Sequence, residues 1–260
     1  MNEKTPQLNQ SVEKALHIIE ILAHSNESMR LFDIAKAAAM PAPTVFRMLN
    51  TLVKCGYAFQ ECDGSQRYGL TLRFLYIGQL SSSHFRIRDM AHPFLVALAQ
   101  ESGESCCLSV NENGVVRYID VVESTSSQIL IRQRIGGTAK MHCTGSGKVF
   151  LCEYDAEKLS DYIREKGLPR LTANTITSEE VLEYDLQKVR ARGYALDDEE
   201  CEIGMRCMSA PIRDTSGRAI AALSLSGPIT RMNCMRCEQE LIPKLCEYAN
   251  AITEQICGKR

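Results

Sequence analysis

The first part of the chain owes its predicted fold to the stretch PTVFRMLNTLVKC, residues 43–55. Apolar side chains recur in it at the three- and four-residue spacing of a buried helix face, namely Val45, Met48, Leu49, Leu52 and Val53. Pro43 suits the first turn of a helix, and Gly56 suits its end. The opposite face of this predicted helix is polar, net positive and free of acidic residues, and it carries Thr44, Arg47, Thr51 and Lys54.

Two helices are expected before this one. Ser11 can cap a helix whose apolar stripe runs from Val12 to Leu22, and a shorter helix is expected between Leu31 and Ala38. Met40-Pro41 then forces a turn, because proline disfavours helix in the residue before it. A helix-turn-helix places the outer face of its second helix in the major groove of DNA, so Thr44 and Arg47 would lie nearest the base edges.

A β-hairpin is expected after the third helix. Residues 57–61 and 66–70 read as strands, and Asp63-Gly64 between them is a turn signal. Three helices followed by a hairpin are typical of a winged helix, in which Arg67 would lie near the minor groove or the DNA backbone.

A protein-interaction module without a role in DNA binding is the alternative. The charge balance favours it, because seven Lys and Arg stand against seven Asp and Glu in the first 70 residues. The order of the elements and the acid-free helix face favour DNA binding instead.

The whole chain has 260 residues, a net charge of −2, 45% hydrophobic and 24% charged residues, which suits one large or two ordinary globular domains. No apolar run reaches the roughly 18 residues needed to span a bilayer, and the first ten residues lack the apolar core of an export signal. We therefore expect a cytoplasmic protein without a membrane partner. The 12 Cys are irregularly spaced and are expected to be reduced thiols.

The remainder of the chain predicts an α+β domain with a largely antiparallel sheet. A connector helix is expected within 72–80 and a longer helix at 87–101. Strands are expected at 106–110, 115–122, 129–134, 206–213 and 219–226, and helices at 146–153, 178–192 and 233–256.

Two short motifs each leave two interpretations open. Residues 144–148, TGSGK, lack the first Gly and the final Ser or Thr of a phosphate-binding loop, so they are either an ordinary tight turn or a helix N-terminus that holds a carboxylate. The acidic run 197–200 is either a solvated loop, or one of its acids faces a pocket and accepts a hydrogen bond from a ligand.

A metal- or thiol-responsive sensor is a further alternative, and it would use Cys234 and Cys237. The two form a single CxxC at the start of a predicted helix, which would lower a thiol pKa, but a zinc ribbon needs a second such pair. No Ser/His/Asp or Cys/His arrangement stands out, so we expect no enzyme activity, no metal site and no cofactor.

Several segments in order resemble the IclR family of bacterial regulators. Residues 41–49 are similar to its recognition helix, 68–71 to the end of its wing and 141–148 to a turn of its effector domain. The most specific stretches are 193–200, 204–207 and 221–228. The resemblance covers essentially the whole chain.

The resemblance implies a winged helix-turn-helix domain at 9–71, a dimerising linker helix at 72–85 and a GAF-like effector-binding domain at 86–260. It implies a repressor or activator of catabolic genes that binds a palindromic duplex operator as a homodimer or homotetramer and responds to a small organic acid or aromatic compound. The expected DNA-binding residues are Ala42, Pro43, Thr44, Arg47, Thr51, Lys54 and Arg67. The family often has a basic or hydroxyl pair where Ala42-Pro43 stands, so a different operator sequence is expected.

By the same resemblance, the effector-binding residues are Gly145, Ser146, Asp197, Met205, Cys207, Ser224 and Ser226. Asp197 would accept a hydrogen bond from a ligand hydroxyl, and Met205 and Cys207 would form an apolar wall. Ser224 and Ser226 alternate along one strand, so both would face the ligand.

Overall fold

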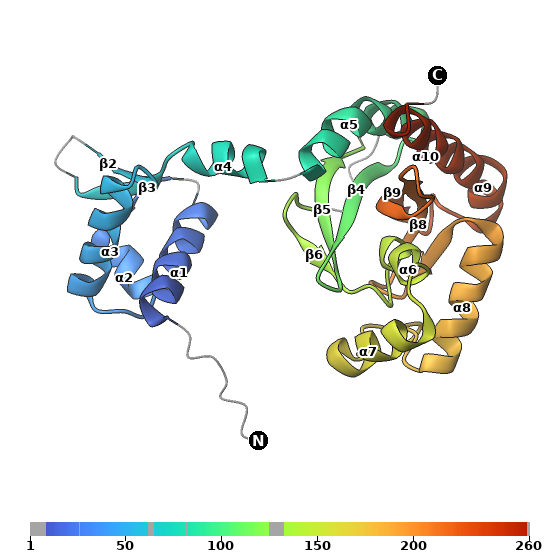
Figure 1. Ribbon diagram of the computed structural model, residues 1–260, viewed down its shortest axis with the longest axis horizontal. Helices are drawn as coiled ribbons and strands as arrows, with labels where there is room; N and C mark the ends of the chain where they lie inside the picture. Colours follow the sequence, from blue (N-terminus) through green and yellow to red (C-terminus); the bar gives the residue numbers. More distant parts are fainter. Residues whose placement is uncertain (1–8, 26, 62–64, 82, 125–132, 259–260) are drawn as a thin grey trace. The chain divides into compact units, whose positions relative to one another are not determined.

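The computed structural model describes residues 9–25, 27–61, 65–81, 83–124 and 133–258. The chain forms two compact units, residues 1–82 and residues 83–260, each with its own elements (Figure 1). Within the described residues, none of the helices has the combination of length and apolarity that crossing a bilayer requires.

The first unit has three helices and a small antiparallel sheet, followed by a fourth helix. The helices are α1 (Gln10–His24), α2 (Leu31–Ala37), α3 (Ala42–Lys54) and α4 (Arg73–Ser81), and the strands are β1 (Met29–Arg30), β2 (Ala58–Gln60) and β3 (Arg67–Leu70). The sheet order is β1-β3-β2. The predicted helices and hairpin strands are present, the predicted turn at Asp63-Gly64 lies outside the described residues, and β1 was not expected.

Apolar side chains from all three helices and the wing hold this unit together. Ile18, Ile34, Val45 and Leu49 are fully buried, and Tyr68 of β3 closes the cluster. The cap of α1 is Asn9 rather than the expected Ser11, since the Asn9 side-chain oxygen accepts from the amides of Ser11 and Val12 at 3.0 and 3.4 Å. This packing leaves the opposite side of α3 facing solvent.

The second unit is built on one six-stranded antiparallel sheet. Its strands are β4 (Ser105–Glu112), β5 (Val115–Val122), β6 (Thr138–Ala139), β7 (Ala195–Asp198), β8 (Met205–Arg213) and β9 (Ala219–Pro228). They lie in the order β6-β5-β4-β9-β8-β7. The sequence did not predict β6 or β7. Most of the predicted strand 129–134 lies outside the described residues, and residues 133–134 are not part of a strand.

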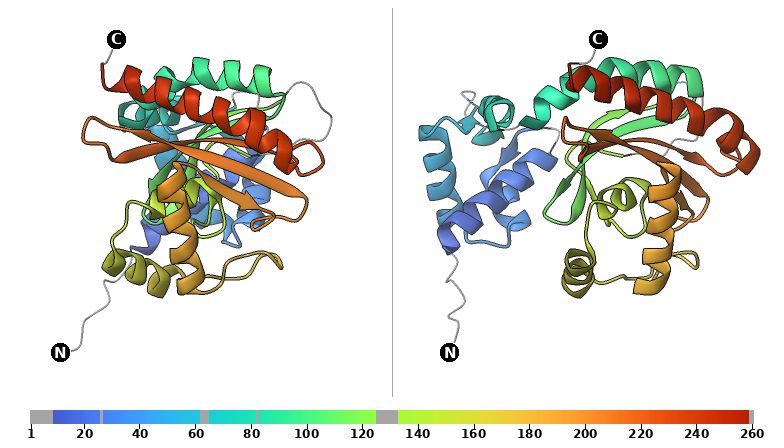
Figure 2. Two further views of the ribbon diagram at one scale, coloured as in Figure 1. Left: turned by 90° about the vertical axis from the view of Figure 1, so that its right-hand side faces the viewer. Right: turned by 45° about the vertical axis from the view of Figure 1, so that its right-hand side comes forward.

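Helices cover both faces of this sheet (Figures 1 and 2). One face packs against α5 (Ser83–Ser102) and α10 (Ile242–Ile256), and the other against α6 (Gly145–Leu151), α7 (Ala156–Lys166) and α8 (Glu179–Arg192). The single helix predicted at 233–256 is interrupted, because α9 (Cys234–Arg236) passes through a π-helical turn at Cys237–Leu241 before α10 begins. The helix α7 was not predicted.

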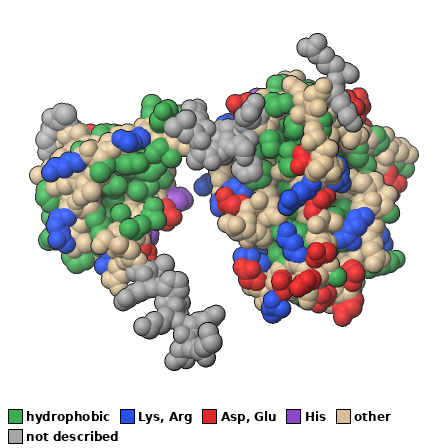
Figure 3. All heavy atoms as spheres, viewed as in Figure 1, with side chains coloured by type: hydrophobic (Ala, Val, Ile, Leu, Met, Phe, Trp, Pro, Cys, Tyr) green, Lys and Arg blue, Asp and Glu red, His purple; other side chains and the backbone are tan. Residues whose placement is uncertain are grey.

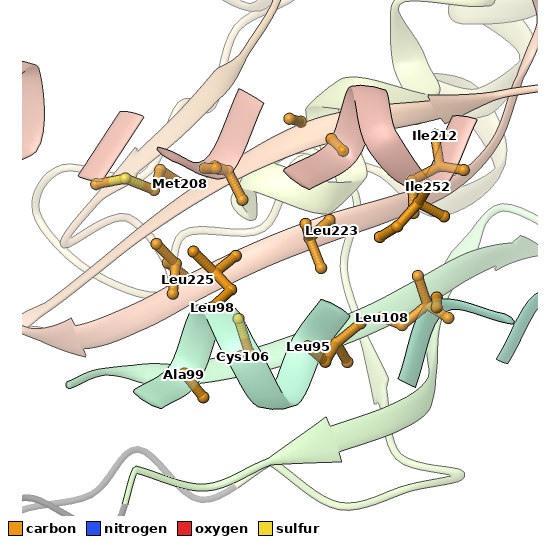
Figure 4. Packing of buried hydrophobic residues seen from close by; sticks show 14 of the residues in the cluster. Leu95, Leu98, Ala99, Cys106, Leu108, Met208, Ile212, Leu223, Leu225 and Ile252 are labelled. Atoms are coloured by element: carbon orange, nitrogen blue, oxygen red, sulfur yellow. The ribbon is translucent and has the colours of Figure 1, made fainter. Parts of the chain in front are cut away.

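The two faces of the sheet differ in composition. On the α5/α10 face, large side chains such as Leu95, Leu108, Leu223 and Ile252 interdigitate and are fully buried (Figure 4). On the α6 face, the central strands carry mainly Ser, Cys and Ala. Small side chains allow a helix to approach a sheet closely, so this face determines how near α6 lies to the central strands.

Candidate functional site

The exposed side of α3 is the candidate nucleic-acid interface. Arg47, Thr51, Lys54 and Pro43 are exposed, and Thr44 is half-buried. The first turn of α3 contains no acidic residue, and Lys54 lies in its last turn. In Figure 3, Lys and Arg side chains lie along the edge of the unit that carries α3. The face predicted from sequence spacing is therefore solvent-exposed.

The burial pattern shifts the centre of this face slightly from the predicted one. At 100° per residue, the fully buried positions Val45 and Leu49 lie opposite Arg47 and Lys54. Asn50 falls beside Lys54, whereas Phe46 lies at the edge of this face, about 100° from Arg47. Phe46 is exposed and Asn50 is half-buried. Asn50 lies three residues after Arg47, so it shares the same helical face. The sequence analysis did not include it among the DNA-binding residues.

Three residues predicted to contact DNA are restricted by an intramolecular hydrogen bond or by partial burial. The Thr51 hydroxyl donates to the Arg47 carbonyl at 2.9 Å, within its own helix. Ala42 is half-buried at the start of α3. The Arg67 guanidinium donates to the carbonyl of Ser28 at 2.5 Å, which ties β3 to the residue just before β1. Arg47 and Lys54 remain the cations of the predicted set that α3 itself presents to solvent.

The α6 face of the second unit brings the predicted effector residues together. Register places Ser105, Ser226, Cys207 and Asp197 on one row across β4, β9, β8 and β7. The neighbouring row is Cys107, Ser224, Ser209 and Ala195. Because side chains two apart on a strand share a face, both rows point to the same side. Met205 lies on the same side of β8, two residues before Cys207.

Helix α6 sits directly on these rows. A methyl group added at Gly145 would lie 2.6 Å from the Ser209 hydroxyl, so only glycine fits there. The Ser224 hydroxyl lies 2.8 Å from that of Ser146 and 2.6 Å from that of Ser209. We call the following residues the inner-face cluster: Ser146, Asp197, Cys207, Ser209, Ser224 and Ser226.

The three hydroxyls at the centre of the cluster bind one another, whereas two other polar groups lack partners. Asp197 is fully buried, and its Oδ1 accepts from the amides of Glu200 and Cys201 at 2.9 and 3.2 Å. Among the described residues, Asp197 Oδ2 and Ser226 Oγ are buried without a hydrogen-bond partner. Such groups are costly unless a ligand or water satisfies them. Ser224 and Ser146 therefore position α6, while Asp197 and Ser226 are available to a ligand.

The charge state of Asp197 follows from its surroundings. Burial raises the pKa of this carboxyl to about 7, and the two amide hydrogen bonds and Lys148 counteract part of that rise. Lys148 itself is held elsewhere, because its ammonium group is 2.5 Å from Glu200 Oε1 and 2.8 Å from Asp185 Oδ2. Near neutral pH, Asp197 is therefore present both as an acceptor carboxylate and as a donor carboxylic acid.

Two neighbours of the cluster were missed by the sequence analysis. Tyr118 of β5 is cross-strand neighbour of Ser109, and burial together with nearby thiols and Asp197 raises the pKa of its hydroxyl. The side-chain amide of Gln133 donates to the Tyr118 hydroxyl at 3.4 Å, and its carbonyl oxygen has no partner in the described part of the chain. Strand alternation shows which residues of β5 share a face with Tyr118. The face itself could be assigned only once the order of the strands was known.

The two open sequence motifs resolve as follows. The TGSGK stretch opens α6, and the Thr144 hydroxyl accepts from the amide of Gly147 at 3.2 Å, so this helix start supplies its own cap. In the acidic run, Asp197 and Glu200 are buried and Asp198 pairs with Arg206. A solvated loop is therefore wrong for two of the four acids, whose buried positions lie on β7 and just after it.

The predicted thiol pair at Cys234 and Cys237 does not have the expected environment. Cys234 is exposed, and Cys237 is buried with its thiol donating to the Met232 carbonyl at 3.4 Å. Burial raises the pKa of Cys237 instead of lowering it. Among the described residues, no three His, Cys, Asp or Glu side chains are grouped as metal ligands.

Comparisons with known proteins agree with this architecture. The family model described as bacterial transcriptional regulator IclR C-terminal matches residues 79–254, and the IclR helix-turn-helix domain matches residues 11–61. The transcriptional repressor IclR of Escherichia coli (strain K12) is 32% identical over 225 residues, which cover 86% of this chain and 81% of that repressor.

Solved structures of other regulators share the fold. The IclR of Thermotoga maritima superposes with a TM-score of 0.81 at 30% identity, covering 95% of this chain and 98% of that one. An IclR homolog from Microbacterium hydrocarbonoxydans, solved in complex with 4-hydroxybenzoate, gives a TM-score of 0.79 at 24% identity and covers 95% of this chain and 98% of that one. The predicted fold and the predicted absence of an enzyme are thereby confirmed: the chain belongs to the IclR family of DNA-binding transcriptional regulators.

Proposed function

We propose that this regulator binds a palindromic operator through α3 and controls catabolic genes in response to a small organic acid held at the inner-face cluster. The observation that carries the DNA-binding part is the solvent-facing side of α3, which presents Arg47 and Lys54 and no acid. Arg47 donates to a guanine edge or a phosphate, and Lys54, two turns further on, lies near the DNA backbone. Ala42 and Pro43 bring the start of α3 close to the bases without supplying a polar contact.

Replacement of Arg47 by alanine tests the DNA-binding part. Its side chain is solvent-exposed, so the substitution should leave folding intact and weaken operator binding by roughly 1–3 kcal/mol, about 5- to 150-fold. The probe is a duplex selected from a random-sequence library by the wild-type protein, and affinity is measured by gel shift. Lys14→Ala on α1 is the matched control. Equal affinities for wild type and Arg47→Ala would remove α3 from the interface.

The proposal that a small organic acid binds at the inner-face cluster rests on buried polar atoms that lack hydrogen-bond partners among the described residues. Asp197 Oδ2, Ser226 Oγ and Gln133 Oε1 offer acceptors and a hydroxyl, Tyr118 offers a second hydroxyl, and Lys148 is already neutralised by two carboxylates. A small acid that also carries a hydroxyl matches this set: its hydroxyl donates to a carboxylate or amide oxygen, and its carboxylate accepts from Ser226, Tyr118 and protonated Asp197. The Microbacterium hydrocarbonoxydans homolog, which shares the fold, was solved with one such compound, 4-hydroxybenzoate.

Two adjacent acids provide a matched test of this part. Small hydroxy acids, sugar acids and hydroxybenzoates are first screened by thermal shift, since a ligand that binds only the folded state raises its stability. Calorimetry on the hits should then show binding lost in Asp197→Ala and retained in Asp198→Ala, whose exposed carboxylate pairs with Arg206. DNA binding should be intact in both variants. A hit that binds Asp197→Ala as tightly as wild type would place the effector elsewhere.

We also propose that the regulator acts as a dimer. Leu72, Leu75 and Tyr76, at the start of α4, expose large apolar side chains. Exposed apolar patches of this kind mark association surfaces, and a twofold dimer matches a palindromic operator.

A further inference from the structure

The exposed side of α3 has an apolar edge that the proposed function does not use. Phe46 leaves 44% of its surface exposed, and burying a phenylalanine side chain is favourable by itself. Pro43, one turn before it, is also exposed, and Asn50, one turn after it, is half-buried. The first half of α3 therefore presents an apolar surface to solvent, followed by a single amide.

Helix geometry places these three side chains next to one another. Residues four apart differ by about 40° around the helix axis and by about 6 Å along it, so Asn50 is a surface neighbour of Phe46. Residues three apart differ by about 60°, so Pro43 is its neighbour on the preceding turn. Side chains of a helix lean toward its N-terminus. The Phe46 ring therefore lies toward the first turn of α3, and the Asn50 amide lies toward the ring.

The base edges in the major groove differ in what they offer to an apolar ring. Guanine, cytosine and adenine present hydrogen-bond donors and acceptors, whereas thymine adds a C5 methyl group to its O4 acceptor. A ring placed against a polar edge takes water from donors and acceptors without replacing their hydrogen bonds, which is costly. Since the first residues of a recognition helix lie nearest the base edges, the apolar start of α3 favours thymine there.

The side chain of Asn50 favours the same base pair. A side-chain amide has both a donor and an acceptor, and the two together match N7 and N6 of adenine in the major groove. Adenine pairs with thymine, the base that carries the methyl group. The roughly 6 Å between Phe46 and Asn50 along the helix spans at most about two base-pair steps of 3.4 Å, so both side chains reach the same pair or close neighbours.

We propose that α3 reads A·T base pairs, with the Phe46 ring against a thymine methyl and the Asn50 amide on adenine. The inference rests on the proposed binding of α3 to the operator, and it specifies which bases each half-site contains. Arg47 and Lys54 supply the attraction to the duplex, while Phe46 and Asn50 select among sequences.

Deoxyuridine tests the methyl contact, because it pairs as thymine does and lacks only the C5 methyl group. The full-length wild-type protein first selects its duplex from a random-sequence library, and the selected half-sites should share A·T pairs at fixed positions. Replacing the thymines of those pairs by deoxyuridine should weaken wild-type binding about 4-fold for each methyl group, or about 15-fold for both half-sites of a palindrome, as expected from the burial of one carbon.

Two variants and a control assign the contacts to residues. Phe46→Ala should bind the thymine and deoxyuridine duplexes with equal affinity, because no ring remains to meet the methyl group. Replacing adenine by 7-deazaadenine, which lacks the N7 acceptor, should weaken binding of the wild type but not of Asn50→Ala. Phe32→Ala removes a more exposed ring from α2 and should retain the response of the wild type to both modified bases.

The proposal fails if the selected half-sites share no A·T pair, or if the wild type binds the thymine and deoxyuridine duplexes alike. It also fails if Phe46→Ala responds to the methyl group as strongly as the wild type does. In each of these cases, weakened binding by Arg47→Ala would still support α3 as the DNA-binding helix. Unchanged affinity in Arg47→Ala, Phe46→Ala and Asn50→Ala together would overturn both proposals.

Discussion

Asp197 and Asp198 are adjacent and chemically identical, yet the fold gives them opposite properties. Asp197 points to the inner face, where it is fully buried, and Asp198 points outward to Arg206 at 2.6 Å. The difference arises because successive side chains of a strand face opposite sides of the sheet. Burial raises the pKa of the inward residue Asp197, so its titration is coupled to folding.

Replacement of Asp197 by asparagine should remove one component of the pH dependence of stability. Burial raises its pKa from 3.8 to about 7, so between these values the folded protein keeps a proton that the unfolded chain has lost, and stability falls as pH rises. Between pH 5 and pH 8 this group should lower the free energy of unfolding by roughly 3 kcal/mol. Asparagine keeps an oxygen for the Glu200 and Cys201 amides but does not titrate.

Urea unfolding followed by circular dichroism at several pH values checks this expectation, since the chain contains no Trp as a fluorescence probe. The stability difference between wild type and Asp197→Asn should change steadily with pH across that range. Parallel curves for the two proteins would contradict the assigned protonation.

At the scale of elements, α6 can lie close to the sheet because Gly145 and Gly147 have no side chains. A methyl group at Gly147 would lie 2.2 Å from the backbone of Met141, and one at Gly145 would meet Ser209. The Ser146–Ser224–Ser209 hydroxyls then fasten the helix to β9 and β8. Lys148 adds a buried ion pair to α8 through Asp185 and to the segment after β7 through Glu200. The inner-face cluster therefore depends on α6 remaining close to the sheet.

Gly147→Ala should accordingly destabilise the second unit by about 3 kcal/mol or more, at or above the upper end of overpacking costs, because backbone atoms cannot move aside as a side chain can. Gly217→Ala is the matched control: it has open space around it and a φ of +84°, so it should cost only about 1 kcal/mol of backbone strain. The measurement is the urea midpoint of each variant. Equal losses in the two variants would show that close approach at α6 carries no special cost.

At the scale of the whole molecule, the proposed dimer surface lies at the start of α4, within the unit that carries α3. Its first turn is anchored locally, because the Arg73 guanidinium donates to the Cys55 carbonyl at 2.7 Å and lies over the Tyr57 ring. Leu72, with 82% of its surface exposed, and Leu75 face outward from this anchor. The same short segment thus belongs to the first unit and exposes an apolar surface, which is the surface of the proposed dimer.

The double variant Leu72→Glu/Leu75→Glu should dissociate the proposed dimer. Charges on an apolar association surface oppose burial, so sedimentation should show a species nearer the single-chain mass of 29.0 kDa than the wild type does. Operator affinity should fall with it, because a palindrome needs two recognition helices at once. Leu171→Glu, which changes an exposed leucine of the second unit, should affect neither property. An unchanged mass for the double variant would place the dimer contact elsewhere.

The sequence by itself determined the elements whose pattern is local. The apolar spacing of Val45 and Leu49 defined α3 and its solvent face, and β8 and β9 follow directly from the runs 206–213 and 219–226. Such patterns depend only on the repeat of a helix or strand. The short strands β1 and β7 were not predicted, because their stability comes from pairing with β3 and β8 rather than from their own residues.

Only the tertiary structure decided which polar groups are buried and which of them are free. The family resemblance pointed to Asp197, but the run 197–200 does not show that this acid is buried until β7 pairs with β8. Ser224 and Ser226 look alike until α6 satisfies the hydroxyl of Ser224 and leaves that of Ser226 without a partner. Burial and hydrogen-bond satisfaction are properties of neighbours brought together by folding, so spacing along the chain cannot express them.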